Sequence, residues 1–468
     1  MGPDPLFSRL SATLTVLGVF IILSAFVIYL HQGQLQDISD AHFHGPHLTT
    51  DQVAAAARAN FTWKHQHKEA AQQSLPISTA PIIIATSTTQ TTSVPRTTVA
   101  AAPASTTSSS AAPNSSVNAA ASPAPAPAAS TRNDFGIAAG GGLMGLSQTK
   151  LDAYFTALKA LGVTWVRWDM DWTVIQQDSA ASYNWGGADR IAATAAKFGM
   201  HSLVIITYTP DWALDRASDC GLDEHCPPAD PAVFARFAAA VAARYKGSIQ
   251  TWEIWNEPNL NSGWQTAANG AGYSAYLKAA YTAIKQVDPA AVVLSAGLSA
   301  AADRDGNTSP TSFVRQMYAS GAKAYFDGIA LHPYSYPVDA SYVATWNSWQ
   351  QMTGIRQLMI ANGDSAKKIW VTEYGAPTGG PGDSKDLNEL EFAYDSDYMS
   401  EAAQTQMVRD VTQLYNADRQ WMGPFFWYSL KDNGTDESTP ENFFGLLRFD
   451  GSQKPAYQVF KQVIDGQS

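Results

Sequence analysis

The stretch Thr251-Trp252-Glu253-Ile254-Trp255-Asn256-Glu257-Pro258-Asn259 is the part of the sequence that indicates the fold. It opens as an apolar strand-like run and ends in a polar turn that carries Glu257. A second stretch, Trp370-Val371-Thr372-Glu373-Tyr374-Gly375, places Glu373 at the end of another apolar run, 116 residues after Glu257. Parallel sheets that are buried on both faces contain such near-continuous apolar strands. The two stretches therefore predict two strands of one parallel sheet, each ending in a glutamate.

Strand-like and helix-like segments alternate from Asp134 onward. Eight strands are predicted, at Phe135–Ile137, Thr164–Trp168, Ser202–Tyr208, Thr251–Trp255, Val292–Ser295, Gly328–His332, Ile369–Thr372 and Pro424–Tyr428. The predicted helices are Gln148–Leu161, Ala188–Phe198, Ala232–Tyr245, Tyr273–Val287, Ser312–Ala322, Trp349–Ala361, Glu401–Ala417 and Ala456–Ile464. Eight repeats are what a closed (β/α)8 barrel requires. An open doubly wound sheet is the alternative, but Gly140-Gly141-Gly142 lacks the glycine spacing of a dinucleotide loop. We therefore expect an α/β fold of the (β/α)8 TIM barrel type.

Glu257 and Glu373 follow the predicted fourth and seventh strands, and the chemistry of such barrels lies at the carboxyl ends of the strands. Cleavage of a glycosidic bond needs two carboxyl groups, one as proton donor and one as nucleophile or base. The pair therefore indicates glycoside cleavage.

With these motifs in place, residues 134–463 resemble the clan of retaining glycoside hydrolases whose catalytic glutamates lie on strands four and seven. Within the clan the chain looks nearest to family 39 (β-xylosidase and iduronidase relatives), because of the motif Thr209-Pro210-Asp211-Trp212-Ala213, and next to the cellulase-like family 5. Family 39 xylosidases usually carry an additional β-sandwich that has no counterpart among the predicted elements. Xylosidase specificity is therefore not part of the expectation.

The resemblance implies a role for each matching residue. Glu257 would be the general acid/base, protonated at rest, and Glu373 the ionised nucleophile. The implied substrate-binding residues are Asn256 at the sugar 2-hydroxyl, Arg167 and Tyr334 near the nucleophile, His332, Trp427 as the aromatic floor, and Trp212 in a further subsite. Structural alternatives are a salt bridge of Arg167 with Asp169 or Asp171, an ordinary packed or rim position for His332 and Tyr334, and barrel packing for Trp212. No metal or organic cofactor is implied.

The reaction would be hydrolysis of an oligo- or polysaccharide by double displacement. A transglycosylase that remodels a wall polymer would use the same residues, and an idle barrel that only binds glycan would keep the same fold. These two functions remain alternatives.

The first 133 residues have a different composition. The run 12–30 has 19 uncharged, mostly apolar residues, enough to cross a bilayer as a helix, and no small-residue cleavage site follows it. We expect a cytoplasmic N-terminus at 1–11, a signal anchor at 12–30, a juxtamembrane stalk at 31–74, a disordered Ser/Thr/Ala/Pro-rich linker at 75–133 and the catalytic domain at 134–468. The catalytic domain is thus expected outside the cytoplasm, as a monomer tethered to the cell surface. The alanine-rich composition of the chain favours a bacterial, actinobacterial source.

Charge and cysteines limit the partners. After residue 133 there are 24 Lys/Arg and 36 Asp/Glu residues, a net charge of −12, which argues against a nucleic acid as ligand. Cys220 and Cys226 are the two cysteines, six positions apart, and predict a disulfide that closes a loop outside the cytosol. Free thiols, or a metal site that includes His225, are the alternatives.

Overall fold

The computed structural model describes residues 134–466, apart from 216–219, 221–222, 266–267 and 394–396. The predicted anchor at 12–30, stalk and linker lie outside the described residues. Among the helices of the described part, none combines the length and apolar character that a membrane span needs.

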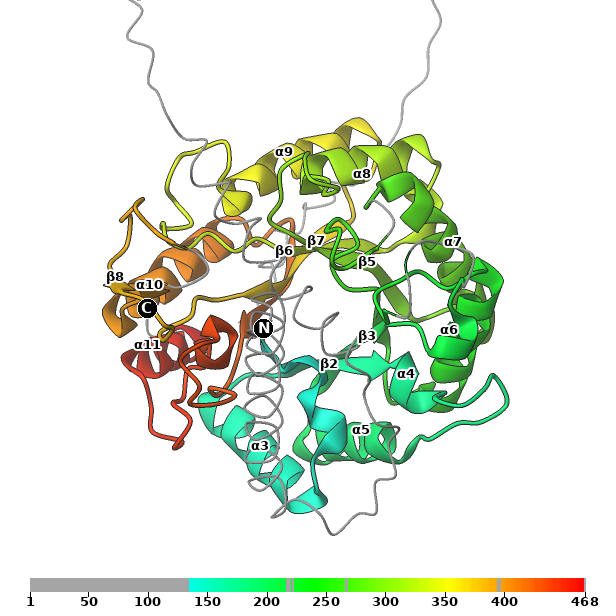
Figure 1. Cartoon of the computed structure of the whole chain (residues 1–468), viewed down its shortest axis with the longest axis horizontal. Helices are drawn as coiled ribbons and strands as arrows, with labels where there is room; N and C mark the ends of the chain where they lie inside the picture. Colours follow the sequence, from blue (N-terminus) through cyan, green and yellow to red (C-terminus); the bar gives the residue numbers. More distant parts are fainter. Residues whose placement is uncertain (1–133, 216–219, 221–222, 266–267, 394–396, 467–468) are drawn as a thin grey trace, which may run out of the picture. The chain divides into compact units, whose positions relative to one another are not determined.

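Eight parallel strands close into a barrel in the order β1-β10-β7-β6-β5-β4-β3-β2 (Figure 1). Their bounds are β1 Phe135–Ala138, β2 Trp165–Asp171, β3 His201–Thr207, β4 Thr251–Ile254, β5 Val292–Ser299, β6 Gly328–His332, β7 Lys368–Tyr374 and β10 Met422–Tyr428. All eight predicted strands are present, so the expected barrel is confirmed. In chain order β10 is the eighth barrel strand.

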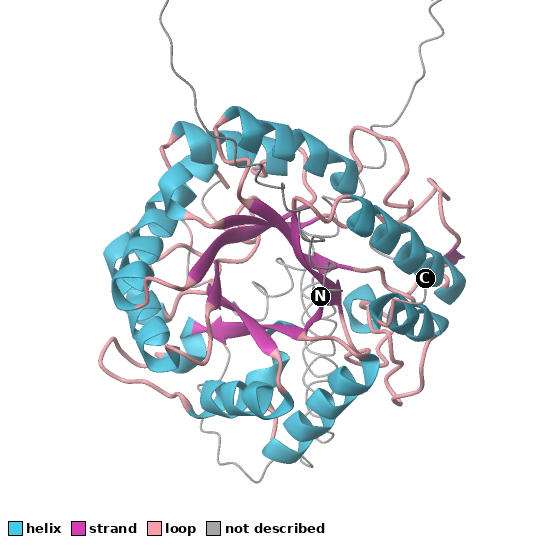
Figure 2. Ribbon diagram, turned by 180° about the vertical axis from the view of Figure 1, so that it is seen from behind, coloured by secondary structure: helices cyan, strands magenta, loops and turns pink. Residues whose placement is uncertain are grey.

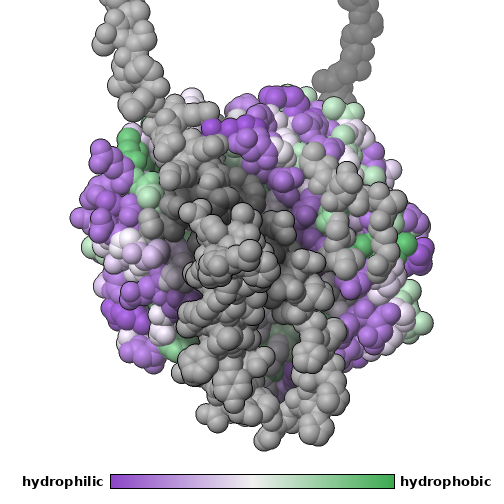
Figure 3. Space-filling view, viewed as in Figure 1, coloured by the Kyte–Doolittle hydropathy of each residue, from purple (hydrophilic) through white to green (hydrophobic). Residues whose placement is uncertain are grey.

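A ring of helices surrounds the barrel (Figure 2). The main helices are α3 Gln148–Leu161, α5 Gly186–Phe198, α6 Pro231–Tyr245, α7 Gly270–Val287, α8 Pro310–Ala319, α9 Ser348–Ala361, α10 Glu401–Ala417 and α11 Pro455–Ile464, with the short α4 at Trp172–Ile175. Polar residues begin many of them; Asp230, for example, caps α6 by accepting a hydrogen bond from Ala232 N at 2.8 Å. The part of the described surface visible in Figure 3 is mostly hydrophilic, as expected when the apolar helix faces pack on the strands.

Side chains alternate along each strand between the barrel interior and the helix layer. On β10, Phe426 belongs to a small interior cluster that includes Leu203 and Leu294, whereas Phe425 and Trp427 belong to the large cluster between strands and helices. Because interior positions near the carboxyl ends of the strands face the barrel mouth, this alternation decides which polar residues reach the site.

Two irregularities adjust this alternation where the site lies. Between the pairs Phe425↔Val371 and Trp427↔Tyr374, β7 contains one residue more than β10, so β7 bulges around Thr372 and Glu373. A similar extra residue lies on β5 between Leu294 and Gly297. A bulge redirects the side chains next to it, and here the bulge on β7 lies at the glutamate predicted to react.

The loop after β7 contains a short parallel ladder, β8 Ser384–Lys385 with β9 Tyr398–Met399. The ladder is only two residues long on each side, too short for a periodic pattern to indicate it.

Candidate active site

Glu257 lies in a sharp turn immediately after β4. Trp255 and Glu257 have left-handed backbone conformations, with φ of 74° and 47°, which are uncommon for residues other than glycine. The turn is held by Glu257 N donating to Gly297 O at 3.0 Å and by Trp255 Nε1 donating to Gly263 O at 2.8 Å. Strained backbone that is held in this way is typical of functional sites, and here it directs Glu257 toward the barrel mouth.

Arg167, an interior residue of β2, links the two catalytic strands. Its Nη1 donates to Glu373 Oε1 at 2.5 Å, and its Nη2 donates to Asn256 Oδ1 at 3.2 Å. Its Nε and Nη2 also bind the two carboxylate oxygens of Glu253 at 2.8 and 3.1 Å. Burial disfavours the charged guanidinium, but Glu253 and Glu373 outweigh that effect and raise the pKa of Arg167 well above its ordinary value. The cation therefore stays charged beside Glu373.

Glu373 is held as an ionised carboxylate. Tyr334 OH donates to its Oε2 at 2.7 Å, opposite the hydrogen bond from Arg167 to Oε1. Burial alone would favour the neutral acid, but the charges of His332 and Arg167 and the two hydrogen bonds lower the pKa of Glu373 below its ordinary value. An ionised carboxylate is what a nucleophile requires.

His332, at the end of β6, connects the two glutamates. Its Nδ1 lies 2.8 Å from Glu257 Oε1 and 3.7 Å from Glu373 Oε2. Burial opposes its protonation, but the charge of Glu373 and the hydrogen bond with Glu257 outweigh this and raise the pKa of His332. Gly297 makes room for the ring, because a Cβ there would lie 2.1 Å from His332 Nε2.

The two predicted catalytic carboxylates are close together and reach the mouth of the barrel. One oxygen of Glu257 and one of Glu373 lie within 4.8 Å of each other. Their side chains are 17% and 14% exposed, whereas Glu253 is fully buried, so only the first two are accessible to a substrate. Glu257, His332 and Glu373 would also suit a metal ion by distance alone. However, both glutamates are already bound by His332, Arg167 and Tyr334, and the charge of Arg167 opposes a second cation.

The prediction that Trp427 forms the aromatic floor of the site was wrong. The ring is completely buried, packs on Phe460 of α11 at a centroid distance of 6.2 Å, and belongs to the layer between strands and helices. A sugar cannot stack on a ring without an exposed face. The next residue, Tyr428, faces the interior, is half-buried, and senses the charges of Glu373 and Asp169, which together with burial raise its pKa. Tyr428 is therefore the aromatic residue of β10 that lies at the site.

Trp212 lies on the β3 side of the barrel, in the short helix η3 (Asp211–Ala213). Its Nε1 donates to Gln176 O at 2.6 Å, and its ring packs edge-on against Trp172 with centroids 5.6 Å apart. These contacts anchor the loop after β3. The structure thus places the half-buried Trp212 in packing at the barrel rim, and its role in a further subsite stays a prediction.

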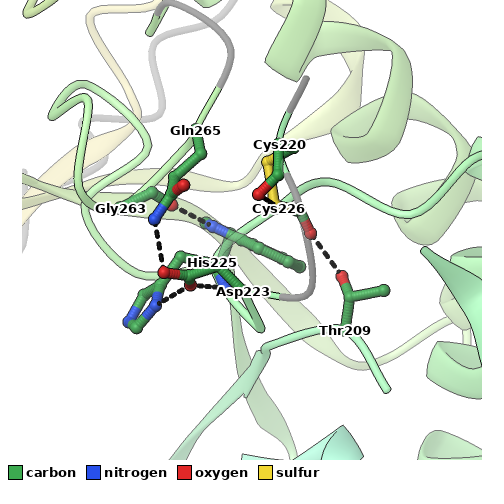
Figure 4. The surroundings of a disulfide bond; sticks show 8 residues. Thr209, Cys220, Asp223, His225, Cys226, Gly263 and Gln265 are labelled. Atoms are coloured by element: carbon green, nitrogen blue, oxygen red, sulfur yellow. Dashed lines mark hydrogen bonds and ion pairs between the residues drawn. A yellow bond between two sulfur atoms is a disulfide. The ribbon is translucent and has the colours of Figure 1, made fainter. Parts of the chain in front are cut away.

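Cys220 and Cys226 form the predicted disulfide, with Cα atoms 6.0 Å apart (Figure 4). Thr209 Oγ1 donates to Cys226 O at 2.7 Å and ties this loop to the end of β3. Inside the loop, Asp223 binds His225 Nδ1 at 2.7 Å and accepts a hydrogen bond from Gln265 at 2.5 Å. Burial opposes protonation of His225, but its hydrogen bond with Asp223 and the charge of Asp223, with smaller effects of Glu224 and Glu257, raise the pKa of His225.

Glu253, Asp169 and Tyr428 also lie at the site, although the sequence motifs did not indicate them as site residues. Glu253 accepts hydrogen bonds from Arg167, from Gly297 N at 2.8 Å and from Thr372 Oγ1 at 3.3 Å. A signal was available, because Glu253 is a charged residue inside an otherwise apolar strand. Such a residue must be paired when it is buried, and Arg167 was the one cation already placed at the site.

Comparisons with known proteins place the chain in a family. The model of glycosyl hydrolase family 10 matches residues 146–463. No curated protein matches the chain significantly.

Solved structures with the same fold include three bacterial enzymes, each with a TM-score of 0.53. A family 39 glycoside hydrolase from Bacteroides cellulosilyticus is 21% identical, with 71% of this chain and 63% of that chain covered. A monomeric β-xylosidase from Caulobacter crescentus is 17% identical, with 70% and 67% covered. The family 39 enzyme from Xanthomonas axonopodis pv. citri is 18% identical, with 70% and 65% covered. The chain thus spans about two thirds of the length of these proteins, and at such identities the likeness concerns the fold.

The predicted resemblance to the clan of retaining barrel hydrolases is confirmed. Family 39 enzymes are among the structural relatives, while the family model that matches is one that the sequence motifs had not singled out. The family model matches more than half of the chain, and the structure is a closed eight-stranded barrel with paired glutamates after β4 and on β7. These findings are sufficient to assign the family. The chain belongs to glycosyl hydrolase family 10.

Proposed function

We propose that this protein is a retaining glycoside hydrolase that cleaves O-glycosidic bonds of an extracellular or cell-envelope polysaccharide. The observation that carries the proposal is the pair Glu257 and Glu373, with oxygens within 4.8 Å and with Glu373 bound by Arg167 and Tyr334. Retaining enzymes keep their two carboxyl groups about 5–5.5 Å apart, whereas inverting enzymes separate them by roughly 6.5–9.5 Å to admit a water molecule. The short separation favours double displacement.

In the first step, a Glu373 oxygen attacks the anomeric carbon while the bond to the leaving oxygen breaks. Glu257 transfers its proton to that oxygen, which departs as a hydroxyl group. His332 binds Glu257 Oε1, so the second oxygen of Glu257 is the one that faces the leaving group. The product is an ester between the sugar and Glu373.

In the second step, the Glu257 carboxylate takes a proton from water as the water oxygen bonds to the anomeric carbon. The ester bond breaks and Glu373 leaves as a carboxylate, again stabilised by Arg167 and Tyr334. Because Arg167 engages the carbonyl oxygen of Asn256, the amide NH2 is the Asn256 group that can contact a sugar hydroxyl.

The proposal extends to location and assembly. The apolar run 12–30 would anchor a monomeric enzyme in the membrane, with the barrel outside the cytoplasm at the end of the 75–133 linker. The Cys220–Cys226 disulfide supports an oxidising compartment. Neutral polysaccharide suits the acidic catalytic domain, and the β-xylosidase among the structural relatives makes β-xylosides sensible first substrates.

The test is to trap the intermediate. We would treat the protein with a panel of activated 2-deoxy-2-fluoro-glycosides, starting with the xyloside, and digest it for mass spectrometry. Glu373 should become esterified, whereas Glu373→Gln should stay unlabelled. Reducing-end release from β-glycans should fall by several orders of magnitude in Glu257→Gln and Glu373→Gln, and remain normal in the exposed control Glu391→Gln.

The products distinguish the alternatives. Longer oligosaccharides at high substrate concentration would assign the enzyme as a transglycosylase, because a sugar rather than water would then accept the intermediate. Glycan binding without cleavage or labelling would leave only the idle binding module.

A further inference from the structure

Asp169 is a buried carboxyl group that the proposed mechanism does not use. It lies on β2, two residues after Arg167, and is 8% exposed. Within the described part of the chain, its carboxylate accepts no hydrogen bond, although it senses the charges of Arg167 and Glu373. Burial raises the pKa of Asp169 to about 7, despite the opposing effect of Arg167. Buried polar groups normally have hydrogen-bond partners, so an unpaired carboxyl group next to the nucleophile requires an explanation.

The carboxyl group lies beside the exposed loop that follows β1. Asp169 Oδ2 lies 3.4 Å from the position that a Cβ of the exposed Gly141 would occupy. Neighbouring Gly140 lies beside Tyr428, with 4.0 Å between its own Cβ position and the Tyr428 ring. Because Gly140 and Gly141 have no side chain, they leave space next to Tyr428 and to the largely buried Asp169 carboxyl group.

The surroundings of Asp169 are anionic. Tyr208 senses the charges of Asp169, Glu224 and Asp171, which add to the effect of burial in raising its pKa. We call Asp169, Asp171 and Glu224 the acidic wall. The nearby cations are already engaged: Arg167 by Glu253 and Glu373, His332 by Glu257, and His225 by Asp223. The described side chains thus provide no unpaired cation to neutralise an acidic sugar at this place.

We propose that Asp169 binds the sugar unit attacked by Glu373, by accepting a hydrogen bond from a hydroxyl or ammonium group of that sugar, and that the acidic wall excludes uronic acids. This inference rests on the proposed function, since it places the sugar at Glu373. A bound donor would supply the partner that Asp169 lacks. A carboxylate in the same place would meet several like charges at short range in a partly buried site.

The experiment is calorimetric titration of the full-length protein in a Glu257→Gln background, so that binding is measured without turnover. The probes are xylobiose, cellobiose, the glucosamine disaccharide, and a disaccharide with glucuronic acid at its non-reducing end. We expect at least one neutral or amino disaccharide to bind, and Asp169→Asn to weaken that binding about tenfold, the usual effect of losing a hydrogen bond to a charged group. Tighter binding of the amino sugar would identify an ammonium group as the donor. Equal or tighter binding of the neutral sugars would identify a hydroxyl group as the donor.

A pair of glycine variants tests the place of binding without altering the carboxyl group. Gly141→Ala puts a methyl group 3.4 Å from Asp169 Oδ2 and should weaken binding severalfold. The matched control Gly142→Ala adds a methyl group that meets nothing within 4 Å, and should bind normally. Asp169→Asn should unfold at an unchanged or higher temperature than its parent, because it removes a buried charge without hydrogen bonds.

Three outcomes would overturn the inference. The first is an unchanged affinity in Asp169→Asn, and the second is binding of the glucuronic acid disaccharide as tight as that of its neutral counterpart. The third is that no probe binds even at a concentration on the order of 10 mM. Failure of the proposed function looks different. If binding depends on Asp169 but Glu373 is never esterified and no glycoside is cleaved, the sugar-binding site is supported and the hydrolytic mechanism is contradicted.

Discussion

Among single residues, Tyr334 and Arg167 together keep Glu373 ionised, one on each carboxylate oxygen. In the proposed mechanism only the ionised form of Glu373 can attack, so the acid limb of the pH–rate profile should report its pKa. Because that pKa is lowered, activity should persist to more acidic pH than an ordinary glutamate would allow.

Tyr334→Phe removes one of the two hydrogen bonds to the carboxylate. The ionised form loses stabilisation, the pKa of Glu373 rises, and the acid limb of kcat/KM should move to higher pH by about one unit, equivalent to roughly 1.4 kcal/mol. The limb is measured from initial rates between pH 3 and 8. Tyr183→Phe, at an exposed residue, is the control and should keep the wild-type limb. A shift toward lower pH would contradict the assignment.

Gly297 is the residue at which the site tolerates no side chain. A Cβ there would lie 2.1 Å from His332 Nε2 and 2.7 Å from Glu253 Oε1, both on buried side chains. Gly297→Ala should therefore displace His332 or break the Arg167–Glu253 pair, reduce activity at least a hundredfold, and destabilise the fold by about 1–3 kcal/mol. Thermal unfolding and initial rates measure both effects.

Gly354→Ala is the matched control, because Gly354 lies within α9 and a Cβ there meets nothing within 4 Å. It should stabilise the protein by about 1 kcal/mol through helix propensity and leave the rate unchanged. Equal behaviour of the two variants would show that close packing at Gly297 is unimportant.

At the level of elements, the loop between β3 and α6 connects the disulfide to the site. The pairs Asp223–His225 and Asp223–Gln265 hold the loop together, and the charge of Glu257 has a small effect on the pKa of His225. The disulfide closes this short loop against Thr209.

Replacing both cysteines by serine should raise KM more than it lowers kcat, because the loop carries His225, whose pKa responds to Glu257, and supplies no reacting group in the proposed mechanism. The stability lost should be about 2 kcal/mol, as expected from the entropy of a short closed loop. Reducing agent should reproduce the effect in the wild type and have no effect on the double variant. If the KM and the stability of the wild type did not change on reduction, while mass spectrometry showed free thiols, the proposed role of the disulfide would be contradicted.

For the whole molecule, we expect the barrel to fold without the first 133 residues. The hydrophobic core of the described part begins with Phe135 on β1, which pairs with β10 and β2 and closes the barrel. A protein that begins at Asp134 should show an unfolding midpoint within a few degrees of the full chain and the same kcat on small soluble glycosides. Circular dichroism melting and initial rates measure this. A much lower midpoint would mean that the barrel depends on contacts from the earlier residues.

The local pattern of the sequence was sufficient for much of the fold. Each of the eight strands is a short apolar run between turn residues, and each main helix shows an amphipathic repeat, so periodicity alone located them. The helix Gln148–Leu161, for instance, has in the structure the bounds that its pattern predicted, with Ser147 as cap and Gly162 after its end. The order of strands and helices then allowed one closed parallel topology.

The site was only partly accessible from the sequence, and Trp427 and Tyr428 show why. Both are aromatic residues near the end of the same strand, and only the register of β10 against β7 and β1 decides that Tyr428 faces the interior while Trp427 faces α11. Because side chains alternate every residue, an error of one position exchanges the two faces of the strand.

The sequence by itself determined the class of barrel, the two strand-end glutamates, and the cysteine pair, because each depends on residues that are close along the chain or on the simple order of elements. Only the tertiary structure decided that Glu253 supports Arg167 and that Tyr428 rather than Trp427 lies at the mouth. It also decided that Asp169 receives no hydrogen bond from the side chains that the structure describes. These features arise from burial, strand register and bulges, which depend on contacts between residues far apart in sequence. Closure of the barrel is what brings those residues together.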